Sequence, residues 1–223
     1  MIRALIFDLD GTLLDTLEDL ADATNAALRA CDLPERTIDE VRMFVGNGVR
    51  NLMLCAVPGG EENPRFEEAF AFFKKYYGAH CKEKTGPYAG IMELLQELKD
   101  RGIGTAIVSN KIDSAVKALN REYFYGLTQA AIGEMDGIAR KPAPDTVFKA
   151  MEELKVGPED AIYVGDSDVD IETARNAGLA CISVTWGFRD EDFLKEHGAA
   201  TLVHRPEEIL KLLTDQSRMC EEA

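Results

Sequence analysis

The chain has 223 residues, 46% of them hydrophobic, enough to bury a full core as one domain or as a domain that carries a large insertion. Its 25 basic and 40 acidic residues give a formal charge of −15, so its surface field repels nucleic acid and anionic membranes. Five scattered cysteines lack zinc-ligand spacing and are typical of reduced thiols, and no run of about 18 apolar residues predicts a membrane span. We therefore expect a cytoplasmic protein that binds neither nucleic acid nor membrane.

The first apolar run, Ala4–Phe7, predicts a buried strand that ends in Asp8-Leu9-Asp10-Gly11-Thr12. Residues two apart on a strand project the same way, so the carboxylates of Asp8 and Asp10 would point together. Two carboxylates this close repel each other unless a cation neutralises them or one is protonated, which indicates a site for a metal ion or a phosphate. An ordinary acidic turn at Asp10-Gly11 is the alternative interpretation of this motif taken alone.

Residues 16–84 show only helical periodicity and predict an inserted helical bundle. The expected helices cover residues 17–28, 49–57 and 66–81, and Thr37-Ile38-Asp39-Glu40 has the pattern of a helix capping box. Both borders of this segment would lie close to the tip of the first strand. An insertion there could act as a lid.

Downstream of Gly86-Pro87, apolar and helical segments alternate, which predicts a parallel sheet flanked by helices. The expected strands are 103–108, a short stretch up to 132, 161–164 and 181–185, and the expected helices are 91–101, 114–123, 146–154, 169–177 and 207–213. Ligands of such sheets collect beyond the carboxyl ends of the strands, so the residues that follow each strand are the candidates for a site.

Two of these junctions carry groups suited to phosphate. Ser109-Asn110-Lys111 follows the strand 103–108, where a hydroxyl and backbone amides at a helix start could hold phosphoryl oxygens, although a simple helix cap fits the triplet equally well. Lys141 precedes Pro142, which favours an extended backbone just before a helix. A lysine fixed there could offset the charge of nearby carboxylates and bind a phosphate. The alternative is that Lys141 is a solvated surface lysine without a role in a site.

The strand 161–164 ends in a loop with three acids, Asp166, Asp168 and Asp170. One carboxylate near a helix start is favoured by the helix dipole, but three in five positions indicate a divalent cation, most plausibly magnesium with oxygen ligands. The spacing does not fit a calcium-binding helix-loop-helix loop, because the acid that its last position requires is absent.

Together, the Asp8 motif, Ser109, Lys141 and the Asp166 loop resemble the four motifs of the haloacid dehalogenase superfamily, in order and spacing over nearly the whole chain. The resemblance implies an α/β fold with a Rossmann-like catalytic core, residues 1–15 and 85–223, and an inserted all-helical type 1 cap, residues 16–84. An aspartate at position 10 is absent from the dehalogenases of this superfamily, so the resemblance disfavours carbon–halogen cleavage. Segments 45–50, 109–111 and 184–188 look most like bacterial phosphoglycolate phosphatases, with Trp186 a departure from their common tyrosine.

The resemblance also implies roles for individual residues. Asp8 would attack phosphorus and Asp10 would serve as general acid and base. Mg²⁺ would be held by Asp8, by the backbone carbonyl of Asp10 and by Asp166, with Asp170 orienting its waters. Ser109, the amide of Asn110 and Lys141 would hold the phosphoryl oxygens. In the cap, Gly46-Asn47-Gly48 and Arg50 are candidates for contacts with the leaving group, against the alternative of a flexible turn and a surface arginine.

These features predict a magnesium-dependent phosphomonoester hydrolase, monomeric or dimeric, that acts on a small phosphorylated metabolite, with 2-phosphoglycolate as the first candidate. A generalist phosphatase, a pyrophosphatase and a β-phosphoglucomutase-like mutase share the same core, so the motifs fix the chemistry better than the substrate. A metal-bound scaffold without turnover is the alternative outside enzymes, and the complete motif set argues against it.

Overall fold

The computed structural model describes residues 2–221, with side chains described for residues 2–214. Within this range the chain forms two compact units, one made of residues up to Leu13 and from Pro87 onward, and the other of Leu14–Gly86. These boundaries lie within two residues of the sequence-based ones. The division into a catalytic core and a cap remains a prediction, because compactness alone assigns neither role.

The first unit is an α/β layer structure around a six-stranded parallel sheet with strand order β5-β4-β1-β6-β7-β8. The predicted fold class is confirmed. Its strands are β1 (Ala4–Phe7), β4 (Gly104–Ile112), β5 (Ala130–Glu134), β6 (Ala161–Gly165), β7 (Ala180–Val184) and β8 (Thr201–Val203). The helices are α5 (Ile91–Asp100), α6 (Asp113–Tyr123), α7 (Asp145–Leu154), α8 (Asp168–Ala177), α9 (Glu191–Glu196) and α10 (Pro206–Glu221).

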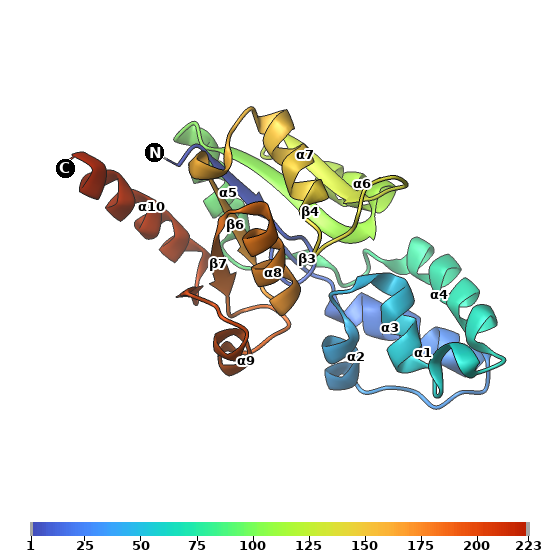
Figure 1. Cartoon of the computed structure of the whole chain (residues 1–223). Helices are drawn as coiled ribbons and strands as arrows, with labels where there is room; N and C mark the ends of the chain where they lie inside the picture. The colour runs from blue at the N-terminus through green and yellow to red at the C-terminus, as the bar shows by residue number, and fades with distance from the viewer. Residues whose placement is uncertain (1, 222–223) are drawn as a thin grey trace. The chain divides into compact units, whose positions relative to one another are not determined.

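Strand β1 is central, and all four of its side chains are fully buried. It is apolar on both faces because helices cover both sides of a parallel sheet. Ala4 and Ile6 pack with the helices α7 and α8 (Figure 1), while Leu5 and Phe7 point to the opposite face. Each large apolar side chain buried in this way contributes about 1.5–3 kcal/mol of hydrophobic stabilisation. The burial fixes the position of the strand end that carries Asp8.

Strand β4 runs further than the sequence predicts. It continues through Ile112, with a register shift against β5 between Val108 and Ile112, and α6 begins only at Asp113. The triplet 109–111 therefore lies in the irregular last part of a strand and not at a helix start, which corrects the expectation. The segment reads as a break because three polar residues follow an apolar run, but all three side chains are buried.

The regular structure of the second unit is helical apart from the two-residue strand β2 (Leu14–Asp15). This strand pairs with β3 (Gly86–Pro87) at the point where the chain enters and leaves the unit. Its helices are α1 (Leu17–Ala30), α2 (Ile38–Phe44), α3 (Gly48–Ala56) and α4 (Phe66–His80), with a short 3₁₀ turn η1 (Gly60–Glu62). The predicted capping box of Thr37 and Glu40 is present. Buried Asp19 accepts hydrogen bonds from the backbone amides of Lys84 and Thr85, which ties α1 to the end of the unit.

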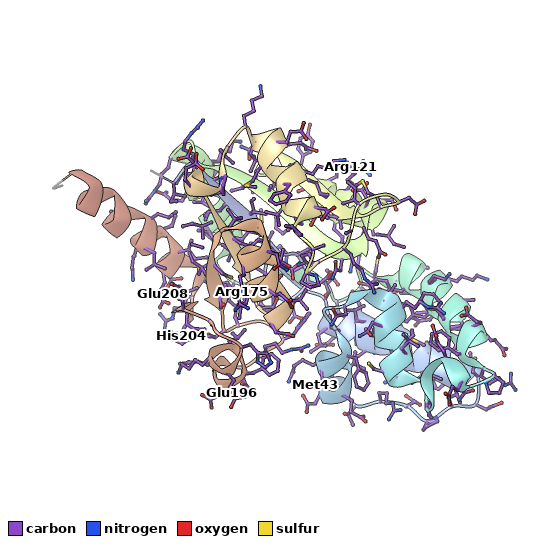
Figure 2. The ribbon with its side chains drawn as sticks, viewed as in Figure 1. Met43, Arg121, Arg175, Glu196, His204 and Glu208 are labelled. Atoms are coloured by element: carbon purple, nitrogen blue, oxygen red, sulfur yellow. The ribbon has the colours of Figure 1, made fainter. Side chains whose placement is uncertain are left out.

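Side chains on the surface of the second unit include Met43 on α2, which is 56% exposed (Figure 2).

Cys31, Cys55, Cys81 and Cys181 are free thiols, and Cys220 lies outside the residues whose side chains are described. Within the described chain, every helix is too short or too polar to cross a bilayer.

Candidate active site

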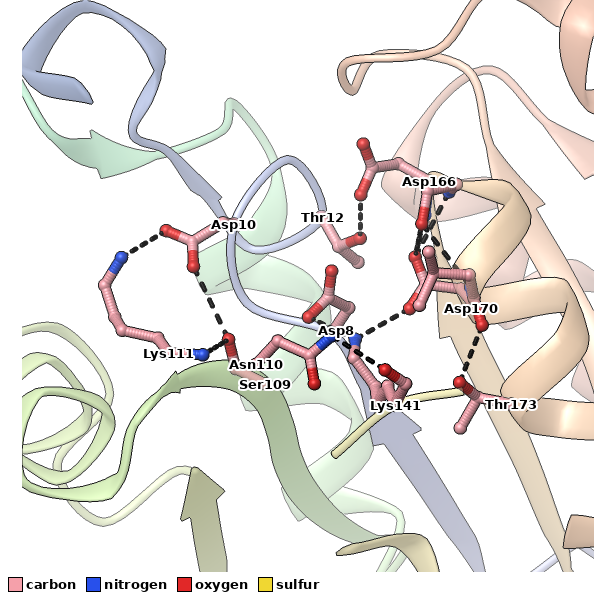
Figure 3. Close-up of polar contacts among 12 residues, drawn as sticks. Asp8, Asp10, Thr12, Ser109, Asn110, Lys111, Lys141, Asp166, Asp170 and Thr173 are labelled. Atoms are coloured by element: carbon pink, nitrogen blue, oxygen red, sulfur yellow. Dashed lines mark hydrogen bonds and ion pairs between the residues drawn. The ribbon is translucent and has the colours of Figure 1, made fainter. Parts of the chain in front are cut away.

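The predicted site residues of the first unit meet at the carboxyl ends of β1, β4 and β6 (Figure 3). Carboxylate oxygens of Asp8, Asp166 and Asp170 lie within 4.8 Å of one another, and all three residues are buried. Asp168, the third acid of the same loop, is half-buried and lies 4.0 Å from Arg189 Nε instead. The acidic cluster thus draws on two strands that are far apart in the sequence.

Lys141 is the cation at the centre of this cluster. Its Nζ lies 2.7 Å from Asp8 Oδ1 and 2.8 Å from Asp170 Oδ1, and the side chain is 3% exposed. Burial alone would lower the pKa of Lys141, but the charges of Asp170 and Asp8 outweigh it and hold that pKa above its usual range. Lys141 is therefore a fixed positive charge inside the site.

Two acids of this cluster, Asp8 and Asp166, have raised pKa values. Burial raises the pKa of Asp8 well above its usual value, and the neighbouring charge of Asp170 raises it further, against the lowering effect of Lys141. Burial and Asp170 also raise the pKa of Asp166 to about 7, although the amide of Phe188 opposes this. The cluster carries more negative charge than its lysine neutralises, as expected of a divalent cation site.

Asp170 acts as the hub of the hydrogen-bond network. Its Oδ1 accepts from Lys141 Nζ and from Tyr163 Oη (2.8 Å), and its Oδ2 accepts from the amides of Asp166 and Ser167 and from Ser167 Oγ (2.6 Å). It also forms the capping box of α8 with Ser167. With five donors around it, Asp170 is held rigidly and is better suited to orient its neighbours than to bind a metal directly.

Asp166 is positioned by the loops on either side. Thr12 Oγ1 donates to its Oδ1 (3.0 Å), and the amide of Phe188 donates to its Oδ2 (2.8 Å). Gly11 has a φ of +89°, and a Cβ there would lie 2.4 Å from Asp166 Oδ2. Glycine is required at this turn both for its backbone angle and for the approach of the carboxylate.

Asp10 lies on the other side of Asp8 from this cluster (Figure 3). Its Oδ1 is 2.8 Å from Lys111 Nζ, and its Oδ2 accepts a 3.4 Å hydrogen bond from Ser109 Oγ. Asn110 Nδ2 donates to the carbonyl of Lys141 (3.0 Å), which links β4 to the lysine loop. The triplet 109–111 thus contacts both Asp10 and the loop that carries Lys141.

Sequence reasoning missed three contributors to this site. Lys111 was read only as part of a triplet, yet its position two residues after Ser109 on a strand signals that both point the same way. Tyr163 lies in an apolar strand and gave no polar signal. Trp186, which departs from the tyrosine common in similar phosphatases, donates from Nε1 to the carbonyl of Thr12 (3.0 Å).

The candidates in the second unit are placed differently. Arg50 Nη2 lies 2.8 Å from carboxylates of Glu61 and Glu67, and its guanidinium lies over the rings of Phe66 and Phe70. This arginine is paired within its own unit, and its contact with a substrate carboxylate stays a prediction. Gly46, in the loop before α3, and Gly48, the first residue of α3, both have positive φ.

Comparison with known proteins agrees with this geometry. The family model for haloacid dehalogenase-like hydrolases matches residues 5–184, which include the Asp8 motif, Ser109, Lys141 and the Asp166 loop. The chain belongs to this family. The predicted family membership is therefore confirmed, and so is the predicted enzyme class, a phosphatase of this family.

Individual relatives cover almost the entire hydrolase. A phosphoglycolate phosphatase of Aquifex aeolicus is 33% identical over 95% of this chain and 97% of its own length. An N-acetylmuramic acid 6-phosphate phosphatase of Pseudomonas aeruginosa is 31% identical over 95% of both chains. The solved structure of a Lactobacillus delbrueckii subsp. bulgaricus protein assigned as a phosphoglycolate phosphatase superposes with a TM-score of 0.89 at 36% identity, covering 93% of this chain and 96% of that one.

Proposed function

We propose that this hydrolase is a magnesium-dependent phosphomonoesterase that works through an aspartyl phosphate on Asp8. The observation that carries the proposal is the burial of Asp8, Asp166 and Asp170 around Lys141, with oxygens within 4.8 Å of one another. Such an excess of buried negative charge is costly in the absence of a cation. It suits a reaction whose main requirement is neutralisation of phosphoryl charge.

The donor set fits Mg²⁺, a hard cation that prefers carboxylate and carbonyl oxygens and retains several waters. Asp8, Asp166 and the backbone carbonyl of Asp10 would hold it. The acceptor positions of Asp170 are taken by five donors, so Asp170 would position Lys141 and the loop of Asp166 rather than the waters of the ion. Bound there, the ion would neutralise charge on the phosphoryl group and its leaving oxygen.

Asp8 is proposed as the nucleophile. One of its oxygens contacts Lys141, which fixes the orientation of the carboxylate. A carboxylate oxygen attacks phosphorus, the bond to the ester oxygen breaks, and the phosphoryl group is carried on Asp8 until water hydrolyses the acyl phosphate. Lys141 remains a hydrogen-bond donor throughout and compensates charge on the transferring oxygens.

Asp10 is proposed as the general acid and base. It would give a proton to the departing ester oxygen and later remove one from the hydrolytic water. Ser109, 3.4 Å from Asp10 Oδ2, and the amide of Asn110 would hold phosphoryl oxygens together with Lys141. The position of the triplet in the last part of β4, in contact with Asp10 and with the loop that carries Lys141, supports this role.

The proposed first substrate is 2-phosphoglycolate, which is supported by the phosphoglycolate phosphatases among the relatives. A generalist phosphatase is the second candidate, favoured by the equally similar N-acetylmuramic acid 6-phosphate phosphatase. The helical unit is proposed to act as a cap that shapes the choice among small phosphorylated metabolites. We place this activity in the cytoplasm, in a monomer or dimer, on the composition of the chain.

The test is phosphate release from 2-phosphoglycolate, N-acetylmuramic acid 6-phosphate, pyrophosphate, β-glucose 1-phosphate and p-nitrophenyl phosphate, with MgCl₂ and with EDTA. We expect magnesium-dependent release with the highest kcat/KM for 2-phosphoglycolate. Similar low values for all monoesters would indicate a generalist. Isomerisation of the sugar phosphate without release would indicate a mutase, and activity unaffected by EDTA would contradict the metal-dependent mechanism.

A further inference from the structure

Two buried lysines lie on different sides of Asp8. Lys141 lies among the acids that would face the phosphoryl group, whereas Lys111 lies beside Asp10, on the far side of Asp8 from Asp166 and Asp170 (Figure 3). The side chain of Lys111 is only 6% exposed, and its Nζ is 2.8 Å from Asp10 Oδ1. A buried ammonium is stable only where anions compensate its charge, so the surroundings of Lys111 favour negatively charged groups.

The segment that carries Lys111 is held in place on both sides. The amide of Lys111 donates to Ser109 Oγ (3.2 Å). The side chain of Asn110, the residue between these two, donates to the carbonyl of Lys141 (3.0 Å). The ion pair with Asp10 is therefore built into the strand end and does not result from a mobile surface side chain. It gives the ammonium a defined distance from the group that is proposed to protonate the leaving oxygen.

That distance decides what Lys111 can reach. Proton transfer requires the leaving oxygen within hydrogen-bond distance of Asp10, about 3 Å. Lys111 Nζ is one further hydrogen bond away from the same carboxylate. A group attached two bonds beyond the leaving oxygen of the substrate is therefore within reach of the ammonium.

We propose that Lys111 is a specificity residue that binds a carboxylate placed next to the leaving oxygen of the substrate. This inference rests on the proposed function and names its substrate class, short phosphomonoesters of 2-hydroxy acids. The ammonium would bridge Asp10 and the substrate carboxylate, and an uncharged group at the same place would not form this charge-assisted contact. We assign the binding of the substrate carboxylate to Lys111 and not to Arg50, because the guanidinium of Arg50 is paired with Glu61 and Glu67.

The test compares 2-phosphoglycolate with 2-hydroxyethyl phosphate, which has the same length and a hydroxymethyl group in place of the carboxylate. The ratio of their kcat/KM values is measured for the magnesium-loaded wild type, Lys111→Met, Lys111→Arg and Arg50→Met, with p-nitrophenyl phosphate as the reference. Lys111→Met should lower the ratio by about tenfold to a hundredfold, the usual worth of a hydrogen bond to a charged group. Lys111→Arg should restore most of the ratio.

Other outcomes overturn the inference. If Lys111→Met slows 2-phosphoglycolate and 2-hydroxyethyl phosphate by the same factor, the ratio is unchanged and the lysine only positions Asp10. If Arg50→Met lowers the ratio and Lys111→Met does not, the carboxylate is bound from the helical unit. If no substrate is hydrolysed, the proposed function fails, and calorimetric titration of wild type and Lys111→Met with 2-phosphoglycolate decides separately: equal affinities contradict the role, and at least about tenfold weaker binding to the variant supports it.

Discussion

Tyr163 Oη donates a 2.8 Å hydrogen bond to Asp170 Oδ1 and accepts one of 3.0 Å from Lys141 Nζ. The tyrosine is fully buried on β6, so its hydroxyl reaches the site from within the apolar core. Removing only this oxygen, in Tyr163→Phe, leaves Lys141 with two acids and one donor position unfilled. We expect kcat to fall about tenfold, because a buried hydrogen bond to a charged group is worth about 1.5–3 kcal/mol. Tyr125→Phe, at an 85% exposed position, is the control; equal kcat in both variants would contradict a positioning role.

Substitution of Asp8 and substitution of Asp10 should lower turnover in different ways. Asp8→Asn should lower turnover by about 10⁴-fold or more, since it removes the nucleophile. Asp10→Asn should lower it by about 10²–10⁴-fold, the usual contribution of a general acid and base. With p-nitrophenyl phosphate, whose leaving group needs little protonation, Asp10→Asn should accumulate phosphoenzyme. Intact-protein mass spectrometry after acid quench measures it: one added phosphoryl group is expected in Asp10→Asn and none in Asp8→Asn, and the reverse pattern would exclude Asp8 as the nucleophile.

Lys141 links catalysis to stability. Lys141→Ala should lower kcat by about 10²–10³-fold, as removal of an oxyanion-stabilising donor does. It should also destabilise the metal-free fold by about 3–5 kcal/mol, because Asp8 and Asp170 lose the cation that pairs them in a buried site. Urea unfolding and steady-state kinetics measure both effects, with exposed Lys117→Ala as the control. Retained activity in Lys141→Ala would remove its catalytic role.

Metal binding should change how stability depends on pH. The pKa of Asp166 is raised from 3.8 to about 7 in the fold, so between these values the native state binds more protons than the unfolded state. Stability in EDTA should therefore fall as pH rises from about 4 to about 7, by up to about 1.4 kcal/mol per pH unit for this group. Saturating MgCl₂, which favours the ionised acid, should flatten that fall. Urea unfolding at pH 5, 6 and 7 measures it; Asp166→Asn should lack the difference, and identical slopes with and without Mg²⁺ would contradict a metal at Asp166.

Gly11 should be intolerant of even one methyl group. Gly11→Ala combines a positive φ with a Cβ placed 2.4 Å from Asp166 Oδ2, so it should displace that carboxylate. Gly178→Ala has a similar φ, +73°, but nothing within 4 Å of the added Cβ. Both variants should lose about 1–3 kcal/mol of stability from backbone strain. Only Gly11→Ala should also weaken Mg²⁺ binding measured by calorimetry, and equal metal affinities would show that the contact has no functional role.

The sequence by itself determined the α/β class, the helical insertion and the identity of the main acids. Apolar runs such as Ala4–Phe7 and the loop with Asp166 and Asp170 are local signals, because burial of a strand and the turn after it are set by neighbouring residues. The resemblance of the ordered motifs to the haloacid dehalogenase superfamily carried this to the family, which the comparisons confirm.

The tertiary structure decided which groups meet. The pairing of Ile112 with Glu134 at the end of β4, the ion pair of Lys111 with Asp10 and the hydrogen bond of Lys141 to Tyr163 all join residues more than 20 positions apart. No periodic pattern in the sequence predicts these contacts. The engagement of Arg50 by Glu61 and Glu67 is likewise a packing outcome. Local patterns fix the elements, but long-range contacts between buried charges fix the site, because each charge settles where its partners compensate its desolvation.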